Sequence, residues 1–267
     1  MKDAHFMPLR QLAAEAVARE AGALARRRFL DASFNVRFKG PQDYLTEVDG
    51  ETEALISARL GEAFPRDGFI GEETEGRPAS GGGATWVVDP IDGTSNFARG
   101  VPHFCVSIAC VAGGRIEVGV IYDPMRDELF SARRGGGSRL NGAPIRPSGA
   151  AALANSAIEV GWNVRTGAAN YLDLLRRVTL WGAAPSRTGS GALGIAYVAV
   201  GRRDGFVEHH INAWDCLAAI LLVHEAGGYV SDFLSGDGLT KGNPLIACAP
   251  GLKDALISAA AIEGIVL

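Results

Sequence analysis

The chain has 267 residues, of which 47% are apolar and 21% are charged, and its formal net charge is −4. This length suits one large domain or two smaller ones with a substantial core. The negative charge argues against a general nucleic-acid-binding protein, because phosphate backbones attract basic surfaces. No apolar run approaches the roughly 18–20 residues that cross a bilayer, and the N-terminus lacks the apolar core of a signal peptide. We therefore expect no membrane partner and a cytoplasmic location.

The cysteine pattern agrees with a reducing compartment. No two cysteines form a C-x-x-C pair, and two of them lie inside apolar stretches. We expect all of them to be buried free thiols, at Cys105, Cys110, Cys216 and Cys248.

The N-terminal part of the chain contains two predicted helices. Apolar residues recur at helical spacing from Leu9 to Arg28, which predicts an amphipathic helix. A loop over residues 39–49 leads to a second predicted helix, from about Asp49 to Ala63. Asp49 or Gly50 lies where an N-cap residue is expected, so a purely structural role is one interpretation of Asp49.

A predicted sheet follows these helices. Short strands at 69–71 and 86–88 are separated by a glycine-rich surface loop at 77–84. The second strand, Trp86-Val87-Val88, is expected to end in a turn at Asp89-Pro90. Further strands are predicted at 104–112, 115–121 and 128–133, with a hairpin at Gly113-Gly114 and a turn at 140–143. We expect an antiparallel sheet backed by the two helices.

The second half of the chain alternates between strands and helices, which favours an α/β layer. A stretch rich in proline, serine, glycine and alanine at 144–154 is a reasonable boundary, so we predict domains at 1–150 and 151–267. The expected strands lie at 156–161, 204–208, 228–233 and 245–249, and the expected helices at 168–178, 192–200, 214–226 and 252–262.

Two aspartates lie three residues apart where the strand at 86–88 ends. At a tight turn, side chains need not alternate between faces, so Asp89 and Asp92 can converge. Two carboxylates held close together repel each other unless one is protonated or a cation lies between them. At neutral pH Mg²⁺ is suited to this position because it takes oxygen ligands. The alternative interpretation is that both residues only cap the turn.

Two further acids occupy comparable positions. Asp215 follows Trp214 at the start of an apolar helix, as either its N-cap or a ligand, and Glu72 follows the strand at 69–71, as either a surface acid or a ligand. Strand ends and helix starts are where α/β folds place their sites. No histidine or cysteine cluster accompanies the acids, so the set favours Mg²⁺ or Mn²⁺ over Zn²⁺.

Four motifs then appear in one order along the chain. They are D-x-[VL]-T-x-x-D at 43–49, G-E-E at 71–73, D-P-[IL]-D-G-[ST]-x-N-F at 89–97, and W-D-x-x-A…E-A-G-G at 214–228. The chain resembles the inositol monophosphatase family, the Mg²⁺-dependent, Li⁺-sensitive sugar phosphatases, over roughly residues 9–250. The resemblance implies the layered α/β/α/β/α sandwich shared with fructose-1,6-bisphosphatase, and a homodimer.

The resemblance also implies roles for individual residues. Asp49, Glu72 and Thr94 would orient and activate a water for attack on phosphorus. Two or three Mg²⁺ ions, or Mn²⁺ in their place, would be held by Glu72, Asp89, the Ile91 carbonyl, Asp92 and Asp215. The implied substrate contacts are Asp92, Gly93, Thr94, Ser190, Gly191, Ala192, Glu208 and Asp215, with Glu208 binding a sugar hydroxyl. His209-His210 replace a residue that is commonly small in the family, so the orientation of the polyol can differ here.

The length of one loop favours small substrates without identifying a single one. The short loop between Glu73 and Trp86 favours hydrolysis of inositol monophosphate or a similar small polyol phosphate, because the nucleotide-bisphosphate phosphatases of this fold usually carry a longer insert. Histidinol phosphate, fructose bisphosphate and nucleotide phosphates remain alternatives for the same chemistry.

Two other classes of function compete with a phosphatase. Residues 189–194 spell G-x-G-x-x-G, but a dinucleotide fold needs a clean strand before the first glycine, and Pro185 and Arg187 stand there instead. A non-catalytic binding module with the same fold is the second alternative. Every side chain that the resemblance implies as a metal ligand carries oxygen here, which argues against such a non-catalytic module.

Overall fold

The computed structural model describes residues 7–32, 34–40, 43–262 and 265–266. Part of the predicted loop at 39–49, namely residues 41–42, lies outside the described residues. The helices are α1 (Met7–Asp31), α2 (Glu47–Ala63), α3 (Thr94–Ala98), α4 (Ala168–Leu180), α5 (Gly191–Ala199), α6 (Ala213–Glu225), α7 (Gly238–Lys241) and α8 (Lys253–Ala260).

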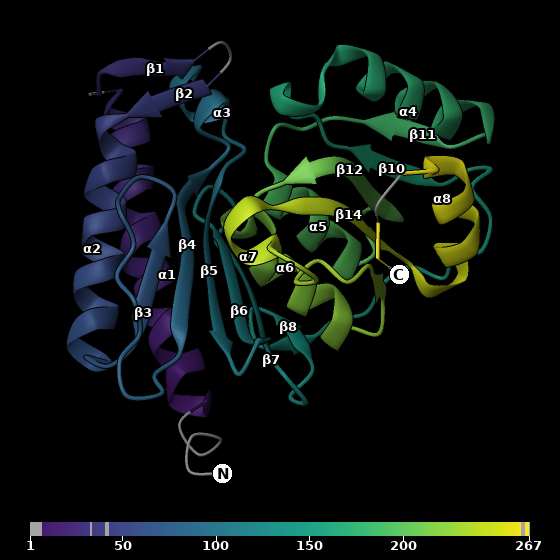
Figure 1. Cartoon of the computed structure of the whole chain (residues 1–267). Coiled ribbons are helices and arrows are strands. Elements are labelled where there is room, and N and C mark those ends of the chain that lie inside the picture. Colours follow the sequence, from purple (N-terminus) through teal and green to yellow (C-terminus); the bar gives the residue numbers. More distant parts are fainter. Residues whose placement is uncertain (1–6, 33, 41–42, 263–264, 267) are drawn as a thin grey trace.

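The strands form two large sheets and a separate hairpin (Figure 1). The seven-stranded sheet has the order β3-β4-β5-β6-β7-β8-β9, and the five-stranded sheet has the order β11-β10-β12-β14-β13. The strands are β1 (Val36–Gly40), β2 (Asp43–Thr46), β3 (Gly68–Gly71), β4 (Thr85–Asp92), β5 (Cys105–Ala112), β6 (Arg115–Asp123), β7 (Glu128–Arg133), β8 (Ser138–Leu140), β9 (Ala143–Pro144), β10 (Ala157–Val160), β11 (Ala184–Ser186), β12 (Gly205–Ile211), β13 (Tyr229–Val230) and β14 (Asn243–Cys248).

The two sheets and their helices form five alternating layers. Helices α1 and α2 pack on the outer face of the seven-stranded sheet, where Ala14 and Ile56 share a core with Val88. Helices α5 and α6 fill the space between the sheets. Helices α4 and α8 cover the far face of the second sheet, where Leu174 packs with Val207. The predicted α/β/α/β/α sandwich is therefore confirmed.

The position of α6 explains its composition. A helix that is apolar all round must be buried on all sides, and residues 216–223 of α6 are all buried. At Gly119 of β6, an added Cβ would lie 2.4 Å from the Ala218 carbonyl oxygen, so only glycine permits this close approach of helix and sheet. Within the described residues, no helix is both long enough and apolar enough to traverse a bilayer.

Several sequence predictions need correction. Strands β3 and β4 pair in parallel, so the first sheet is mixed, and residues 72–84 supply the longer connection that a parallel pair needs. The β1–β2 hairpin was not predicted. Residues 184–186 do form a short strand, β11, and it tolerates Pro185 because it lies at a sheet edge. The strand predicted at 228–233 shrinks to β13, because the Asp232 N–H donates to the Val266 carbonyl at 2.8 Å instead of continuing the sheet.

Candidate metal centre

A β-bulge brings Asp89 and Asp92 to the same face of the sheet. Asp89 pairs with Ser107 and Asp92 with Cys105, so one strand advances by three residues while its partner advances by two. The extra residue shifts the alternation of side chains, and both carboxylates then face one side. The sequence prediction of a turn at Asp89-Pro90 was wrong, because β4 continues to Asp92. Asp89 and Asp92 were expected to converge through a tight turn, whereas the structure brings them together through the β-bulge.

Three carboxylates from separate elements meet beside the bulge. Glu72 follows β3, Asp89 lies on β4 and Asp215 lies in the first turn of α6, and one oxygen from each lies within 4.8 Å of the others. Burial, reinforced by the charges of Glu72 and other nearby acids, raises the pKa of Asp89 well above its ordinary value. Burial and the charge of Asp92 raise the pKa of Asp215 to about 7. The structure therefore assembles a cluster that repels itself at neutral pH.

Asp215 is not the N-cap of α6, which was one of the two roles that the sequence left open. The N-cap of α6 is Asn212, whose backbone N–H and side-chain amide both donate to Asp215 Oδ2 at 3.2 Å. Asp215 is therefore the third residue of a capping box and also a member of the carboxylate cluster. The capping bonds fix its side chain at the helix start, where it can serve as a ligand.

Asp92 links the first sheet to the start of α5. Its Oδ2 accepts hydrogen bonds from the Ser190 hydroxyl and from the Ala192 N–H at 2.9 Å, and the Cys105 thiol lies 3.8 Å away. Burial raises the pKa of Asp92 to about 6, although these donors lower it in part. Ser190 and Ala192, which we predicted to contact substrate, thus hold Asp92 in this structure.

Asp49, which is buried, and Thr94, which is half-buried, form a hydrogen-bonded pair next to the cluster. The Thr94 hydroxyl lies 3.0 Å from Asp49 Oδ1 and 2.9 Å from the Ile91 carbonyl oxygen. The Thr46 N–H and hydroxyl donate to Asp49 Oδ2 at 2.8 and 2.6 Å. Thr46 is the N-cap of α2, so the expected N-cap at Asp49 or Gly50 was wrong by three or four residues. Burial raises the pKa of Asp49 from its ordinary value.

Glu53, which was not predicted from the sequence, holds the turn that carries Glu72. Its side chain is fully buried on α2 and accepts from the Glu73 N–H at 2.9 Å and from the Thr74 hydroxyl. An added Cβ at Gly71 would lie 2.3 Å from this carboxylate, so glycine is needed there. The sequence gives little indication of this role, because an acid on a helix, four residues after Asp49, usually faces solvent.

Gly93 shapes the turn between Asp92 and Thr94. Its φ is +101°, a conformation that favours glycine, and an added Cβ would lie 3.0 Å from the His103 carbonyl oxygen. The chain then enters α3 at Thr94, so the N–H groups of this first turn have no acceptors within the helix.

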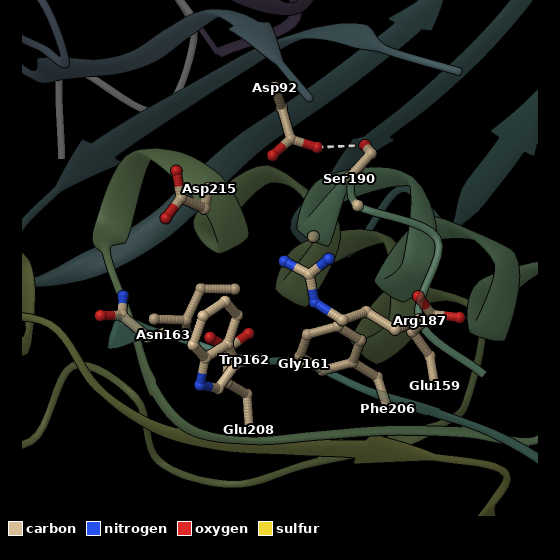
Figure 2. A pocket seen from close by; sticks show the side chains of 13 residues that line it. Asp92, Glu159, Gly161, Trp162, Asn163, Arg187, Ser190, Phe206, Glu208 and Asp215 are labelled. Carbon is tan, nitrogen blue, oxygen red and sulfur yellow. Dashed lines mark hydrogen bonds between the residues drawn. The ribbon is translucent and has the colours of Figure 1, made fainter. Parts of the chain in front are cut away.

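A cavity of about 150 Å³ adjoins the carboxylate cluster (Figure 2). Asp92 and Asp215 line it, together with the predicted contacts Ser190, Gly191 and Glu208. Glu208 is 7% exposed, and burial, followed by the charge of Asp215, raises its pKa well above the ordinary value. Trp162 and Arg187 also line the cavity and were not predicted.

The two histidines that depart from the family pattern lie outside this lining. His210 Nε2 lies 3.5 Å from Arg165 Nη1, whose guanidinium also donates to Asn212 Oδ1 at 2.6 Å. Arg165 therefore links His210 to Asn212, the N-cap of α6. His209 lines a separate hollow with Arg177.

The fold and the carboxylate cluster define a layered α/β protein with a candidate divalent-metal site at the start of its middle helix layer. A model of the inositol monophosphatase family matches residues 8–264. The chain belongs to the inositol monophosphatase family, as the motifs predicted.

Individual relatives agree with this assignment. The chain is 44% identical over 247 residues to the Nus factor SuhB of Pseudomonas aeruginosa, covering 89% of this chain and 90% of that protein. It is 40% identical over 245 residues to the inositol-1-monophosphatase of Mesorhizobium japonicum, covering 91% and 92%.

Solved structures show the same fold. The extragenic suppressor protein suhB of Bartonella henselae is similar with a TM-score of 0.87 at 38% identity, covering 95% of this chain and 98% of that one. The inositol monophosphatase of Anabaena is similar with a TM-score of 0.82 at 31% identity, covering 95% and 96%.

Proposed function

We propose that this chain is a Mg²⁺-dependent phosphomonoesterase that hydrolyses inositol monophosphate or a similar small polyol phosphate. The observation that carries the proposal is the meeting of Glu72, Asp89 and Asp215 within 4.8 Å, beside a cavity lined with polar groups. The family and the inositol-1-monophosphatase names among its relatives support the same chemistry.

The donor set of the cluster fits a hard divalent cation. Its three members offer carboxylate oxygens only, which are the ligands that Mg²⁺ and Mn²⁺ accept and that Zn²⁺ takes less readily than histidine or cysteine. Asp89 is 2% exposed, and burial together with the charges of the neighbouring acids raises its pKa, so a cation between these carboxylates would reduce their repulsion. We infer that the residues fit the metal that the family implies.

Glu72, Asp89, the Ile91 carbonyl, Asp92 and Asp215 would hold two or three such cations. When bound, these cations lower the pKa of a water and stabilise charge on the phosphate and on the leaving oxygen. Asp92 has one oxygen occupied by Ser190 and Ala192, so only Oδ1 is available to a cation.

Asp49 and Thr94 would receive the proton of the attacking water. The Thr94 hydroxyl has one hydrogen and two acceptors, Asp49 Oδ1 and the Ile91 carbonyl. When it donates to Asp49, its oxygen can accept a hydrogen bond from the water and orient it. As the water oxygen bonds to phosphorus, its proton passes to Thr94 and the Thr94 proton passes to Asp49. The ester bond breaks as the oxygen of the attacking water bonds to phosphorus, and the leaving alkoxide takes up a proton from solvent, so that the alcohol is released.

The other side of the site would bind the substrate. The N–H groups of Gly93 and Thr94, at the start of α3, would donate to phosphate oxygens. The buried carboxylate of Glu208 would accept from hydroxyl groups of the alcohol. Ser190, Gly191 and Ala192 are further proposed contacts; the first two line the cavity, and the Ala192 N–H donates to Asp92.

The test is phosphate release from a panel of inositol, sugar, histidinol and nucleotide phosphates, with Mg²⁺ or with EDTA. We expect Mg²⁺-dependent release that is fastest on inositol monophosphate, and Asp92→Asn should abolish it. Release in EDTA, or full turnover by the Asp92→Asn variant, would refute the metal assignment. Release that is fastest on another ester would keep the chemistry and change the substrate.

Further properties stay proposals. From the resemblance we propose inhibition by Li⁺ and a homodimer. From the cysteine pattern and the net charge we propose a cytoplasmic location and no nucleic-acid partner. We also propose that residues 1–150 and 151–267 are separate domains, with ligands of the metal site contributed by both.

A further inference from the structure

Arg187 is a cation in the cavity that the proposed mechanism does not use. It lies in the loop between β11 and α5, and its guanidinium carbon is 5.6 Å from the centre of the Trp162 ring. Figure 2 shows the guanidinium pointing into the cavity. Among the residues that the structure describes, none forms a hydrogen bond or an ion pair with Arg187. Its donors are therefore available to a ligand.

The backbone on both sides of Arg187 is fixed by one buried carboxylate. Glu159 is 2% exposed, and its Oε2 accepts from the Ser186 hydroxyl at 2.7 Å. Its Oε1 accepts from the N–H and the hydroxyl of Thr188 at 2.5 and 2.8 Å. Both chain neighbours of Arg187 are thus held by the same group. The guanidinium is presented to the cavity from an anchored loop, which lowers the entropic cost of binding a ligand.

The surroundings of Arg187 argue for a ligand and against a purely structural charge. The charge of Arg187 partly offsets the raised pKa of Glu208, but among the residues that the structure describes Arg187 forms no close ion pair with Glu208, Asp92 or Asp215, as a structural counter-ion would. The guanidinium lies over the Trp162 indole, with its carbon 5.6 Å from the ring centre, and its planar fork of donors can form two parallel hydrogen bonds. Phosphate and carboxylate groups match that geometry.

Glu208 supplies the complementary feature at the buried side of the same cavity. It is an acceptor for hydroxyl groups, whereas Arg187 is a permanent donor at the exposed side. A neutral polyol would use only the first of these. An alcohol that carries both hydroxyl groups and an anionic group would use both.

We propose that Arg187 recognises a second anionic group, a phosphate or a carboxylate, on the alcohol part of the substrate. This proposal rests on the phosphomonoesterase function proposed above. It makes Arg187 a specificity-determining residue and predicts that the chain accepts polyol phosphates with two anionic groups as well as monophosphates.

The experiment compares the wild type with Arg187→Met, Arg187→Lys and the matched control Arg176→Met. Arg176 is an exposed arginine on α4 that pairs with Asp173 and does not line the cavity. The substrates are myo-inositol 1-phosphate, fructose 1,6-bisphosphate and 6-phosphogluconate, so that a second phosphate and a carboxylate are tested separately. Calorimetric titration with the same compounds in the presence of Ca²⁺ measures binding independently of turnover.

We expect Arg187→Met to lower kcat/KM about tenfold or more for one or both doubly anionic substrates, mainly through KM, and to change it less than about twofold for inositol phosphate. Arg187→Lys keeps the charge without the planar fork, so its kcat/KM for these substrates should lie between those of the wild type and Arg187→Met. Arg176→Met should match the wild type. A loss confined to the bisphosphate would assign phosphate as the anion. Equal losses on all three substrates, or none, would overturn the proposal.

The calorimetric data separate this proposal from the proposed function. If the wild type hydrolyses none of the substrates, the phosphomonoesterase proposal fails. Weaker binding of the doubly anionic compounds alone by Arg187→Met would still support the role of Arg187, and unchanged binding would refute it.

Discussion

Replacing Glu53 should weaken metal binding although the residue belongs to α2 and is not a proposed ligand. Its carboxylate accepts two hydrogen bonds from the turn that carries Glu72, one from the part-buried Glu73 N–H and one from the exposed Thr74 hydroxyl. Hydrogen bonds to a charged acceptor contribute about 1.5–3 kcal/mol when buried and less when water can replace them. We therefore expect Glu53→Ala to cost about 2 kcal/mol of stability, mostly through the Glu73 bond.

Glu53→Ala should weaken metal binding by more than its loss of stability implies, because Glu72 would lose its fixed position. Residues that orient a metal ligand typically contribute a factor of about 10–100 in metal affinity. We would measure Mn²⁺ binding by electron paramagnetic resonance and unfolding by urea titration. Glu53→Gln, which keeps one acceptor oxygen, should lose less Mn²⁺ affinity and less stability than Glu53→Ala.

Glu51→Ala is the matched control for Glu53→Ala. Glu51 is an exposed acid on the same helix that bonds to Arg28 at the surface. Its loss should leave Mn²⁺ affinity unchanged. If Glu53→Ala binds Mn²⁺ as tightly as Glu51→Ala does, the turn does not depend on Glu53 and the reasoning is refuted.

Two further predictions concern catalysis and stability. Thr94→Ala should lower kcat by about 10²-fold or more because proton transfer to Asp49 is lost, and Thr94→Ser should restore most of it; equal rates for the two variants would exclude the hydroxyl relay. Burial raises the pKa of Glu208, so the folded state disfavours its charged form. The resulting loss of folding stability is absent below about pH 4 and grows as the pH rises toward the pKa of the folded state. Glu208→Gln should consequently raise the Tm of the metal-free protein at pH 8 and leave it nearly unchanged at pH 4, while weakening substrate binding; a Tm gain independent of pH would contradict the assignment.

The sequence predicted the elements that depend on local periodicity. The hairpin at Gly113-Gly114 formed as expected, because two residues with φ of +57° and +72° match the turn that joins twisted strands. The apolar stretch that became α6 was predicted as a buried helix for the same local reason. The motifs then identified the family, which in turn implied the layered fold.

Features that depend on contacts between distant residues were not predicted. The bulge between Asp89 and Asp92 exists only in the register with β5. Glu53 and Glu73 lie 20 residues apart, and Glu159 and Thr188 lie 29 residues apart. No local pattern encodes such pairs, and a helical Glu53 looks like any surface acid. The sequence therefore predicted that Glu72, Asp89 and Asp215 would lie together, but not how the protein holds them.

The placement of α5 and α6 between the sheets has a consequence for synthesis of the chain. Every strand of the seven-stranded sheet precedes residue 145, but the helices that cover its inner face begin at Gly191 and Ala213. While the ribosome adds the intervening residues, Val87 and Ile121 on that face have no cover, and such exposed apolar surface promotes aggregation. The same interval leaves Asp92 without its donors from the start of α5. The nascent protein thus depends on the timely arrival of its own C-terminal half, and ribosomes that pause between residues 145 and 225 would prolong its most aggregation-prone state.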